Sequence, residues 1–262
     1  MVARKTGKAS KPKAQATSRP RARPASTAAK PTRAPSFAGF DADLFAFLRE
    51  LTFHNEREWF ESQRERYERS VRQPALAFLA AVGPAIQRVL PSFVADPRPV
   101  GGSLMRIHRD VRFASDKSPY KTNVGMHVRH AVGKDIHAPG VYLHLDADEC
   151  FLGVGLWHPE PEVLGKVRRR IVERPSAWKA AHDGSAFRNA WKPTGESLVR
   201  VPKGFDPAHP HADDLRRKDH LALSPLSFDE VGSAALTKLV SKRLTAARSY
   251  VQFLCDALDL PL

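Results

Sequence analysis

Four segments between residues 103 and 156 alternate apolar and polar side chains with a period of two, and this pattern limits the possible folds more than any other feature. Only residues 147–149 separate the last two segments, which suits a hairpin and leaves no room for a crossover helix. The sequence therefore predicts an antiparallel sheet. Its expected strands are Ser103–Arg109, Thr122–His130, Val141–Asp146 and Cys150–Leu156.

Apolar residues at helical spacing come before this sheet in the sequence. They predict a helix that contains Leu44 and Leu51, and a second one in which Asn55 and Glu58 form a capping box. Gln73-Pro74 is expected to interrupt the second helix. A third helix is then expected from about Pro74 to Val89.

Helical periodicity returns after the sheet. Pro161–Arg174 reads as an amphipathic helix whose Arg168, Arg169 and Arg170 point largely outward. Ser227 and Glu230 form a capping box for another helix, and its apolar stripe extends to Leu258 and is expected to cover one face of the sheet. Residues 175–222 show no clear pattern. We expect an α+β fold, a mainly antiparallel sheet of about four or more strands packed with N-terminal and C-terminal helices.

Charge divides the chain into two parts. Ten of the positive charges lie in residues 1–36, which contain no Asp or Glu, so residues 37–262 hold only +4 of the net +14. The first 36 residues also lack large apolar side chains and cannot offset the entropy of ordering. We therefore expect a disordered basic tail over 1–36 and a single α+β domain over 37–262.

Composition also limits the compartment. Cys150 and Cys255 are too few for a disulfide framework and are expected to be buried thiols in a reducing environment. The sequence has neither the long apolar run of a membrane span nor the apolar segment of a secretory signal. An organellar transit peptide remains an alternative for the tail, although its five prolines argue against one. We expect a cytoplasmic protein without membrane contact.

The segment from Arg109 to Lys121 holds the densest group of charged residues between two expected strands. Arg suits forked recognition of phosphate or carboxylate, and a tyrosine adds a hydroxyl donor. The expected anion partners are Arg106, Arg109, Arg112, Lys117 and Lys121, oriented by Asp110 and Asp116 and joined by the hydroxyl of Tyr120. The alternative is that Arg109 pairs with Asp110, and Asp116 with Lys117, only to hold the loop.

Residues two apart on a strand share a face, so each expected strand offers an apolar row and a second row. The second rows contain His, Arg, Asn, Tyr, Trp and Gly, unlike an ordinary solvent face, and form a candidate pocket floor. The alternative is that the unpatterned segment 175–222 covers this face. The acid/base candidates of the floor are His108, His127, Tyr142 and His144.

Other chemistry finds less support in the sequence. His108, His127 and His144 would suit zinc if they converged, but no HxH or HExxH spacing occurs, so we predict no metal site. Ser115 and Ser118 lack nucleophile-elbow glycines, and no glycine-rich phosphate loop is present. The sequence names no cofactor, no catalytic residue and no reaction.

Three motifs carry a family resemblance. They are 54-HNEREWF-60, 109-RDVRFASDKSPYK-121 and 153-GVGLW-157, and a weaker match follows at 201-VPKGF-205. On these the chain, over about residues 38–258, resembles the conserved hypothetical family called domain of unknown function 2461. His54 departs from the amide residue expected there. The resemblance implies one α+β domain of unassigned activity and supplies no catalytic residues.

Two functional hypotheses of different classes follow from the residues. The first is a site for a small anionic ligand, phosphate- or carboxylate-bearing, that uses the residues named above. The second is weak nucleic-acid association through the basic tail, with the Arg/Lys loop positioned on phosphates. A structural or partner-binding role without a small-molecule site is the remaining alternative, and whether the chain is an enzyme stays open.

Overall fold

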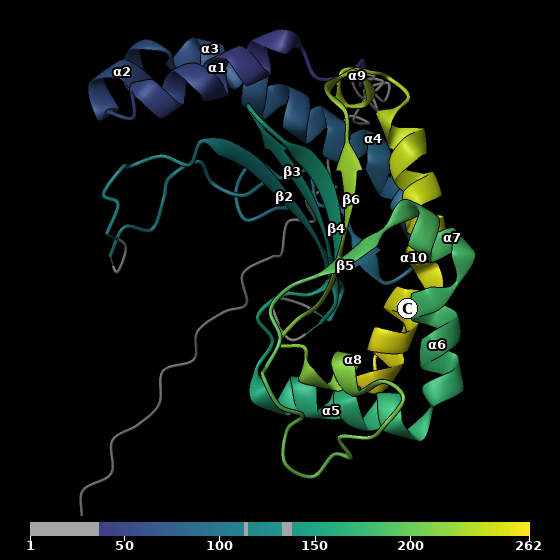
Figure 1. Cartoon of the computed structure of the whole chain (residues 1–262). Coiled ribbons are helices and arrows are strands. Elements are labelled where there is room, and N and C mark those ends of the chain that lie inside the picture. The colour runs from purple at the N-terminus through teal and green to yellow at the C-terminus, as the bar shows by residue number, and fades with distance from the viewer. Residues whose placement is uncertain (1–36, 113–114, 133–137) are drawn as a thin grey trace, which may run out of the picture. The chain divides into compact units, whose positions relative to one another are not determined.

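A computed structural model describes residues 37–112, 115–132 and 138–262 of the chain, so the expected tail lies outside the described residues. Figure 1 shows a twisted sheet with helices behind it and at both of its ends. The sheet has the order β1-β2-β3-β4-β6-β5, and every neighbouring pair is antiparallel. The strands are β1 (Phe93–Val94), β2 (Asn123–His130), β3 (Gly140–Asp146), β4 (Cys150–Leu156), β5 (Lys192–Thr194) and β6 (His220–Leu226). The predicted α+β class is confirmed.

The central strands β2, β3 and β4 follow the alternation of the sequence. In β3 the apolar Val141, Leu143 and Leu145 are buried, while Tyr142 and His144 between them are partly exposed. Burial of the apolar row fixes the register, because a slip by one residue would turn that row to solvent. The three predicted strands in this region are confirmed to within one residue at each end.

Strand β6 arises in the segment that shows no pattern in sequence. It buries His220, Ala222, Ser224 and Leu226 and turns its other residues to the opposite face. Two polar residues in the buried row and Pro225 near the strand end hide its alternation, since Pro is rarely found in a central strand.

The prediction of a first strand at Ser103–Arg109 is wrong, because this segment forms no continuous ladder of hydrogen bonds with a neighbouring strand. This segment contacts the chain around β2 only through isolated bridges, Leu104 to Met126 and His108 to Tyr120. The two bridges differ in register by two residues, so the pairing is broken between them. Residues 103–112 and 115–121 therefore form an irregular hairpin, which we call the arm.

The described residues contain the following helices. They are α1 (Ala42–Phe53), α2 (Arg57–Ser62), α3 (Arg64–Tyr67), the π-helical turn η1 (Glu68–Arg72), α4 (Gln73–Val89), α5 (Pro161–Glu173), α6 (Pro175–Asp183), α7 (Ser185–Ala190), α8 (Ala212–Arg216), α9 (Phe228–Val231) and α10 (Leu236–Ala257). Helices α4 and α10 pack against each other and lie behind the sheet (Figure 1). Their apolar faces join the buried rows of the strands in one core.

Two expectations about the N-terminal helices are wrong. Asn55 does not cap α2, because its side chain donates to the carbonyl of Tyr120 and accepts from the amide of Tyr120, both at 3.0 Å. Pro74 does not interrupt the helix either. The π-helical turn η1 precedes it, and the amide of Gln73 bonds to Glu68, so the helix continues into α4 without the missing amide of proline.

Two further corrections concern the C-terminal half. Arg168 is buried, since its guanidinium donates to the carbonyls of Leu215 and Arg217 at 2.8 Å each and holds α8 against α5. The capping box of Ser227 and Glu230 is confirmed, but it starts only the short α9. The chain turns at Gly232 before the long stripe begins in α10.

The cysteines are buried free thiols, as expected. Cys150 begins β4 and Cys255 lies near the end of α10. Burial raises the pKa of both, that of Cys255 to about 12, so both thiols stay protonated and unreactive. None of the described helices is long and apolar enough to cross a membrane.

Candidate functional site

Charged residues of the arm form ion pairs with one another. Arg109 forms an ion pair with Asp116, and Arg112 forms one with Asp110 at 2.7 Å. The side-chain hydrogen bond from Arg112 lowers the pKa of Asp110 to about 2. The hydroxyl and amide of Ser118 are the main causes that lower the pKa of Asp116. Both carboxylates are thus ionised and paired, although in a different pattern from the alternative pairing expected of the sequence.

The lysines of the arm donate to backbone carbonyls. Lys117 bonds to Val111 at 3.0 Å and Lys121 to Arg106 at 3.2 Å. Burial lowers the pKa of Lys121, and the charges of Arg106 and Arg109 add to this effect. The arm thus brings three cations close together at its base, where it joins β2.

Tyr120 anchors the arm to the N-terminal helices. Its ring stacks on Phe60 of α2 with centroids 4.1 Å apart, and Asn55 holds its backbone. The ring of His108 lies 5.2 Å from that of Tyr120. Tyr120 is 3 % exposed, and burial raises its pKa. The structure therefore places Tyr120 and His108 under α2 and away from the histidines of β2 and β3.

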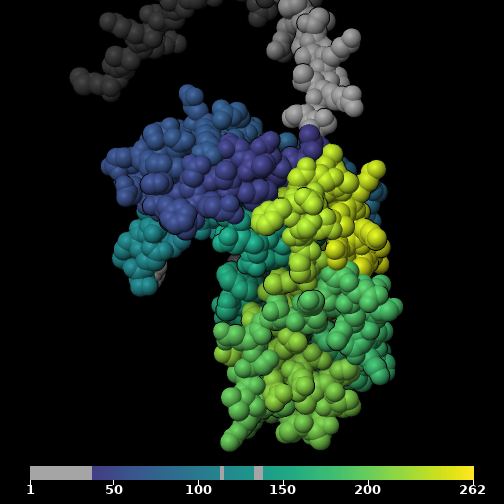
Figure 2. Space-filling view, turned by 45° about the horizontal axis from the view of Figure 1, so that its top comes forward, coloured from purple at the N-terminus to yellow at the C-terminus, as the bar shows by residue number. Residues whose placement is uncertain are grey.

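One face of the sheet, opposite α4 and α10, is the candidate site, and we call it the open face. Figure 1 shows no described helix in front of β2, β3 and β4, and Figure 2 shows a hollow on this side between the arm and the C-terminal part of the sheet. The strand registers give the rows across it: Arg129, Gly140, Gly155 and Leu221; His127, Tyr142, Gly153 and Leu223; Gly125, His144, Phe151 and Pro225; and Asn123 with Asp146.

These rows divide the open face into two halves. The half on β2 and β3 contains imidazole, phenol, amide and guanidinium groups. The half on β4 and β6 is apolar, with Phe151, Leu221, Leu223 and Pro225. The face suits a ligand with one polar end and one apolar end.

Asn123, Tyr142 and His144 form a hydrogen-bonded cluster in the polar half. The Tyr142 hydroxyl lies 3.3 Å from Nδ1 of His144, and the Asn123 amide nitrogen lies 3.4 Å from the same atom. Both neighbours can donate, so Nδ1 accepts and the proton of a neutral ring resides on Nε2. The His144 ring also stacks on Phe151 with centroids 4.6 Å apart. Packing and hydrogen bonds therefore fix the orientation of this imidazole.

His127 is oriented by its neighbour Arg129. The Arg129 Nε donates to Nδ1 of His127 at 3.4 Å, so the neutral ring holds its proton on Nε2. That atom lies above Gly140, where a Cβ atom would come within 2.3 Å of it. Gly125 likewise makes room for the Tyr142 hydroxyl, at 2.7 Å from an ideal Cβ. Gly125 and Gly140 of the candidate pocket floor therefore leave space for the side chains of Tyr142 and His127 rather than for a ligand alone.

Burial sets the protonation of these groups. It lowers the pKa of His127 to about 4, with a smaller contribution from Arg129, and lowers that of His144 against the opposing effect of Asp146. Burial also raises the pKa of Tyr142. At neutral pH the face therefore presents two neutral imidazoles and a protonated phenol, which are able to donate or accept a proton.

Of the sequence-predicted residues, the open face brings together His127, Tyr142 and His144, with Lys121 at the edge toward the arm. The sequence interpretation did not select Asn123 and Arg129, although both lie in the second row of their strand. Asn123 contacts His144 diagonally across two strands, which alternation alone does not give. Arg129 contacts His127 two residues away on the same strand, a spacing that alternation does give. Among the described residues no group of three or more His, Cys, Asp or Glu is arranged to hold a metal ion.

A second polar cluster lies on the covered side of β6 and went unnoticed in the sequence. Asp214 of α8 accepts from Nε1 of Trp178 at 2.8 Å and lies 3.4 Å from both His211 and Arg217. His182 and His220 are buried beside Trp178. The residues are spread over 178–220, and only the abundance of His and Asp between 206 and 220 could have indicated them.

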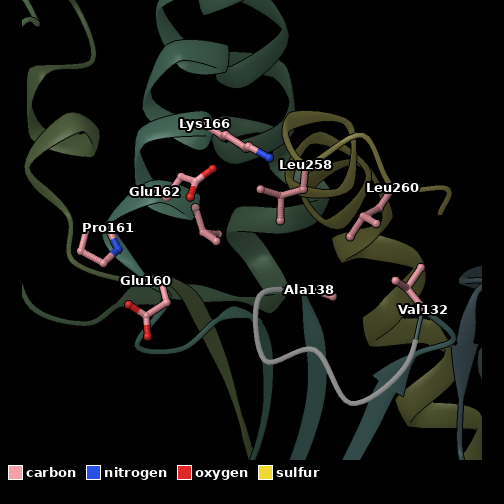
Figure 3. Close-up of a pocket in the computed structure, with 9 residues that line it drawn as sticks. Val132, Ala138, Glu160, Pro161, Glu162, Lys166, Leu258 and Leu260 are labelled. Atoms are coloured by element: carbon pink, nitrogen blue, oxygen red, sulfur yellow. The ribbon is translucent and has the colours of Figure 1, made fainter.

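A pocket of about 550 Å³ lies elsewhere (Figure 3). Its walls are the start of α5, with Glu160, Glu162 and Lys166, and the chain end at Leu258 and Leu260. It contains none of the predicted site residues. Val132 and Ala138 are among its lining residues and flank residues 133–137, which lie outside the described residues.

Comparison with known proteins gives one match. The family model of a conserved hypothetical protein, DUF2461, matches residues 43–253, which include the sheet, the arm and most of the helices. The searches of curated proteins and of solved structures found no match.

Proposed function

The chain belongs to the conserved hypothetical protein family DUF2461, and we propose that it binds a small phosphate- or carboxylate-bearing ligand on the open face. The observation that supports this most is the pairing of Arg129 with a neutral His127 beside the Asn123, Tyr142 and His144 cluster. An ordinary solvent face would not hold half-buried neutral imidazoles in fixed orientations.

Arg129 is the proposed partner of the anionic group. Its Nε bonds to His127, and among the described residues its two terminal nitrogens have no carboxylate partner. A guanidinium with two parallel donors suits the oxygens of phosphate or carboxylate. The arm differs here, because Arg109 and Arg112 already have acidic partners. Lys121 and Arg106 supply further positive charge at the other end of the face.

The remainder of the ligand lies across the strands in this proposal. Its apolar part contacts Phe151 and Leu223, while His144 and Tyr142 hydrogen-bond to its polar groups. His127 and His144 are neutral and retain an Nε2 proton, so a bound ligand can exchange protons with them. These two rings are the acid/base groups if the ligand reacts.

Titration calorimetry of the full chain with inorganic phosphate, AMP and citrate tests the proposal. We expect one of the probes to bind, and Arg129→Gln to weaken that binding by about tenfold or more, because a charge-assisted fork is lost. Arg174→Gln removes one exposed positive charge far from the open face and serves as the matched control. Equal affinities of Arg129→Gln and the wild type, or no binding of any probe, would contradict the proposal.

A further inference from the structure

Helices α4 and α10 carry mainly positive charge. They contain five cations and one acid, Asp256 at the C-terminal end of α10, although residues 37–262 together carry only +4. One of the five, Arg243, turns inward to the carbonyl of Ala190. The remaining four are exposed on α4 and α10, and we call them the basic surface: Arg88, Lys238, Lys242 and Arg248.

These four cations have no carboxylate partner among the described residues. In the part of the chain that the structure describes, none of the four forms an ion pair, and Arg248 only donates to the carbonyl of Val89. Some other exposed arginines do have acidic partners, as the pairs of Arg64 with Glu61 and of Arg98 with Asp96 illustrate. A surface of unpaired cations attracts a polyanion.

A groove of about 430 Å³ crosses this surface between the two helices. Arg88, Lys238, Thr237 and Ser241 line it together with the small residues of α4. Guanidinium, ammonium and hydroxyl groups are the side chains that contact phosphate oxygens of nucleic acids, and small residues allow a backbone to approach closely. The groove presents no aromatic ring or amide for reading bases.

The described part of the chain begins at Phe37, which contacts α4. Phe37 packs edge-on against Phe78 of α4, with ring centroids 5.1 Å apart, one helical turn before Ala81 of the groove. Ten further cations precede Phe37 in the sequence. The chain therefore attaches its most basic segment to the helix that carries half of the groove.

We propose that the basic surface of α4 and α10 binds the phosphate backbone of nucleic acid without sequence specificity. A membrane surface fits less well, because none of the large exposed apolar side chains lies on α4 or α10, where insertion between lipids would need them. This partner is independent of the ligand proposed for the open face, which lies on the opposite side of the sheet.

The test measures fluorescence anisotropy of a labelled 24-base-pair duplex with the full chain at increasing salt. The triple charge reversal of Arg88, Lys238 and Lys242 to Glu is expected to weaken binding by about tenfold or more, and to reduce the salt slope by about 2 to 3, since each lost phosphate contact removes about 0.9. Lys238→Glu alone should weaken binding by about threefold.

Reversal of Arg169, Lys179 and Lys203 to Glu provides the matched control, with the same change in net charge at exposed positions outside α4, α10 and the groove. It should change affinity by about twofold or less at 0.15 M salt, where distant charges are screened. Equal weakening by both triple variants would overturn the proposal, as would absence of duplex binding by the wild type at low salt. Tighter binding to anionic phospholipid vesicles than to the duplex, lost in the same variants, would also overturn it.

Discussion

The two sides of the sheet use histidine in opposite ways. On the open face, His127 and His144 are half-buried, have polar neighbours at Nδ1 and keep Nε2 for another partner. On the covered side, His220 is fully buried, and no described group hydrogen-bonds to either of its ring nitrogens. The same residue type thus serves a surface in one place and fills a core in the other. Burial alone therefore does not distinguish the two settings, whereas oriented polar partners on an uncovered face do.

The covered side is organised by the carboxylate of Asp214. It joins α6 through Trp178 and the segment after α8 through Arg217, and His211 lies beside it. These contacts tie helices to β6, so this cluster supports the fold. The cluster of the open face, by contrast, lies on strands that are already fixed by their ladders.

The largest effect that separates the two sides is therefore expected on stability. Asp214→Ala should lower the free energy of unfolding by about 3 kcal/mol or more, because it leaves a buried indole N–H and a guanidinium without their acceptor. Urea denaturation followed by tryptophan fluorescence measures this loss. Asp213→Ala, which removes an exposed carboxylate paired only with Arg216, is the control and should cost less than about 0.5 kcal/mol. A similar loss of unfolding free energy in both variants would contradict the structural role proposed for Asp214.

The second effect is a dependence of stability on acid. Burial lowers the pKa of His220 to about 3 and that of His127 to about 4, so below pH 6.5 the unfolded chain binds more protons than the folded one. Stability should thus fall as the pH drops from 6.5 toward 3, with about 2 kcal/mol due to His220 by pH 5. Urea denaturation at pH 7 and pH 5 measures this loss.

His220→Leu sharpens this comparison, because leucine fills the core without a titratable group. The variant should lose about half of the histidine-linked decline in stability between pH 7 and pH 5, because His127 contributes about as much as His220 and remains. Any ligand binding on the open face should be retained. A pH dependence equal to that of the wild type would show that His220 is not the buried group responsible.

The smallest effect concerns the open face itself. Gly140→Ala should displace the His127 ring, because the added Cβ would lie 2.3 Å from Nε2. The strand can keep its geometry while a ring moves, so we expect a stability loss of about 1 kcal/mol or less. The ¹⁵N chemical shifts of His127 report the displacement. Gly165→Ala on α5, where only the end of Arg169 lies near, should leave those shifts unchanged.

Much of the fold follows from the sequence, because period-two alternation and short connections leave few choices for β2, β3 and β4. The features that could not be predicted from the sequence depend on tertiary contacts. Asn55 has the position of a helix cap, yet its amide satisfies the backbone of Tyr120, 65 residues away. Arg168 has the position of an exposed cation, yet two carbonyls near α8 accept its donors.

The candidate site could be predicted only in part for a similar reason. Alternation places His127, Tyr142 and His144 in the second, mainly polar row of their strands. The pairing register then brings these rows to one face of the sheet. The arm has the highest density of charge in the sequence, but its two carboxylates pair with Arg109 and Arg112. Arg129 is a single cation in sequence, and its proposed role depends on its bond to His127 and on the absence of a described acidic partner.

The most direct measurement is a ¹⁵N-detected titration of all histidine side chains between pH 3 and pH 8, with and without inorganic phosphate. The account predicts that phosphate bound by Arg129 raises the pKa of His127 from about 4 and shifts the resonances of His144, while those of His182 and His220 remain unchanged. Resonances of His127 and His144 that do not respond to phosphate, AMP or citrate, or that respond no more than those of His220, would contradict the central claim that the open face is a ligand site.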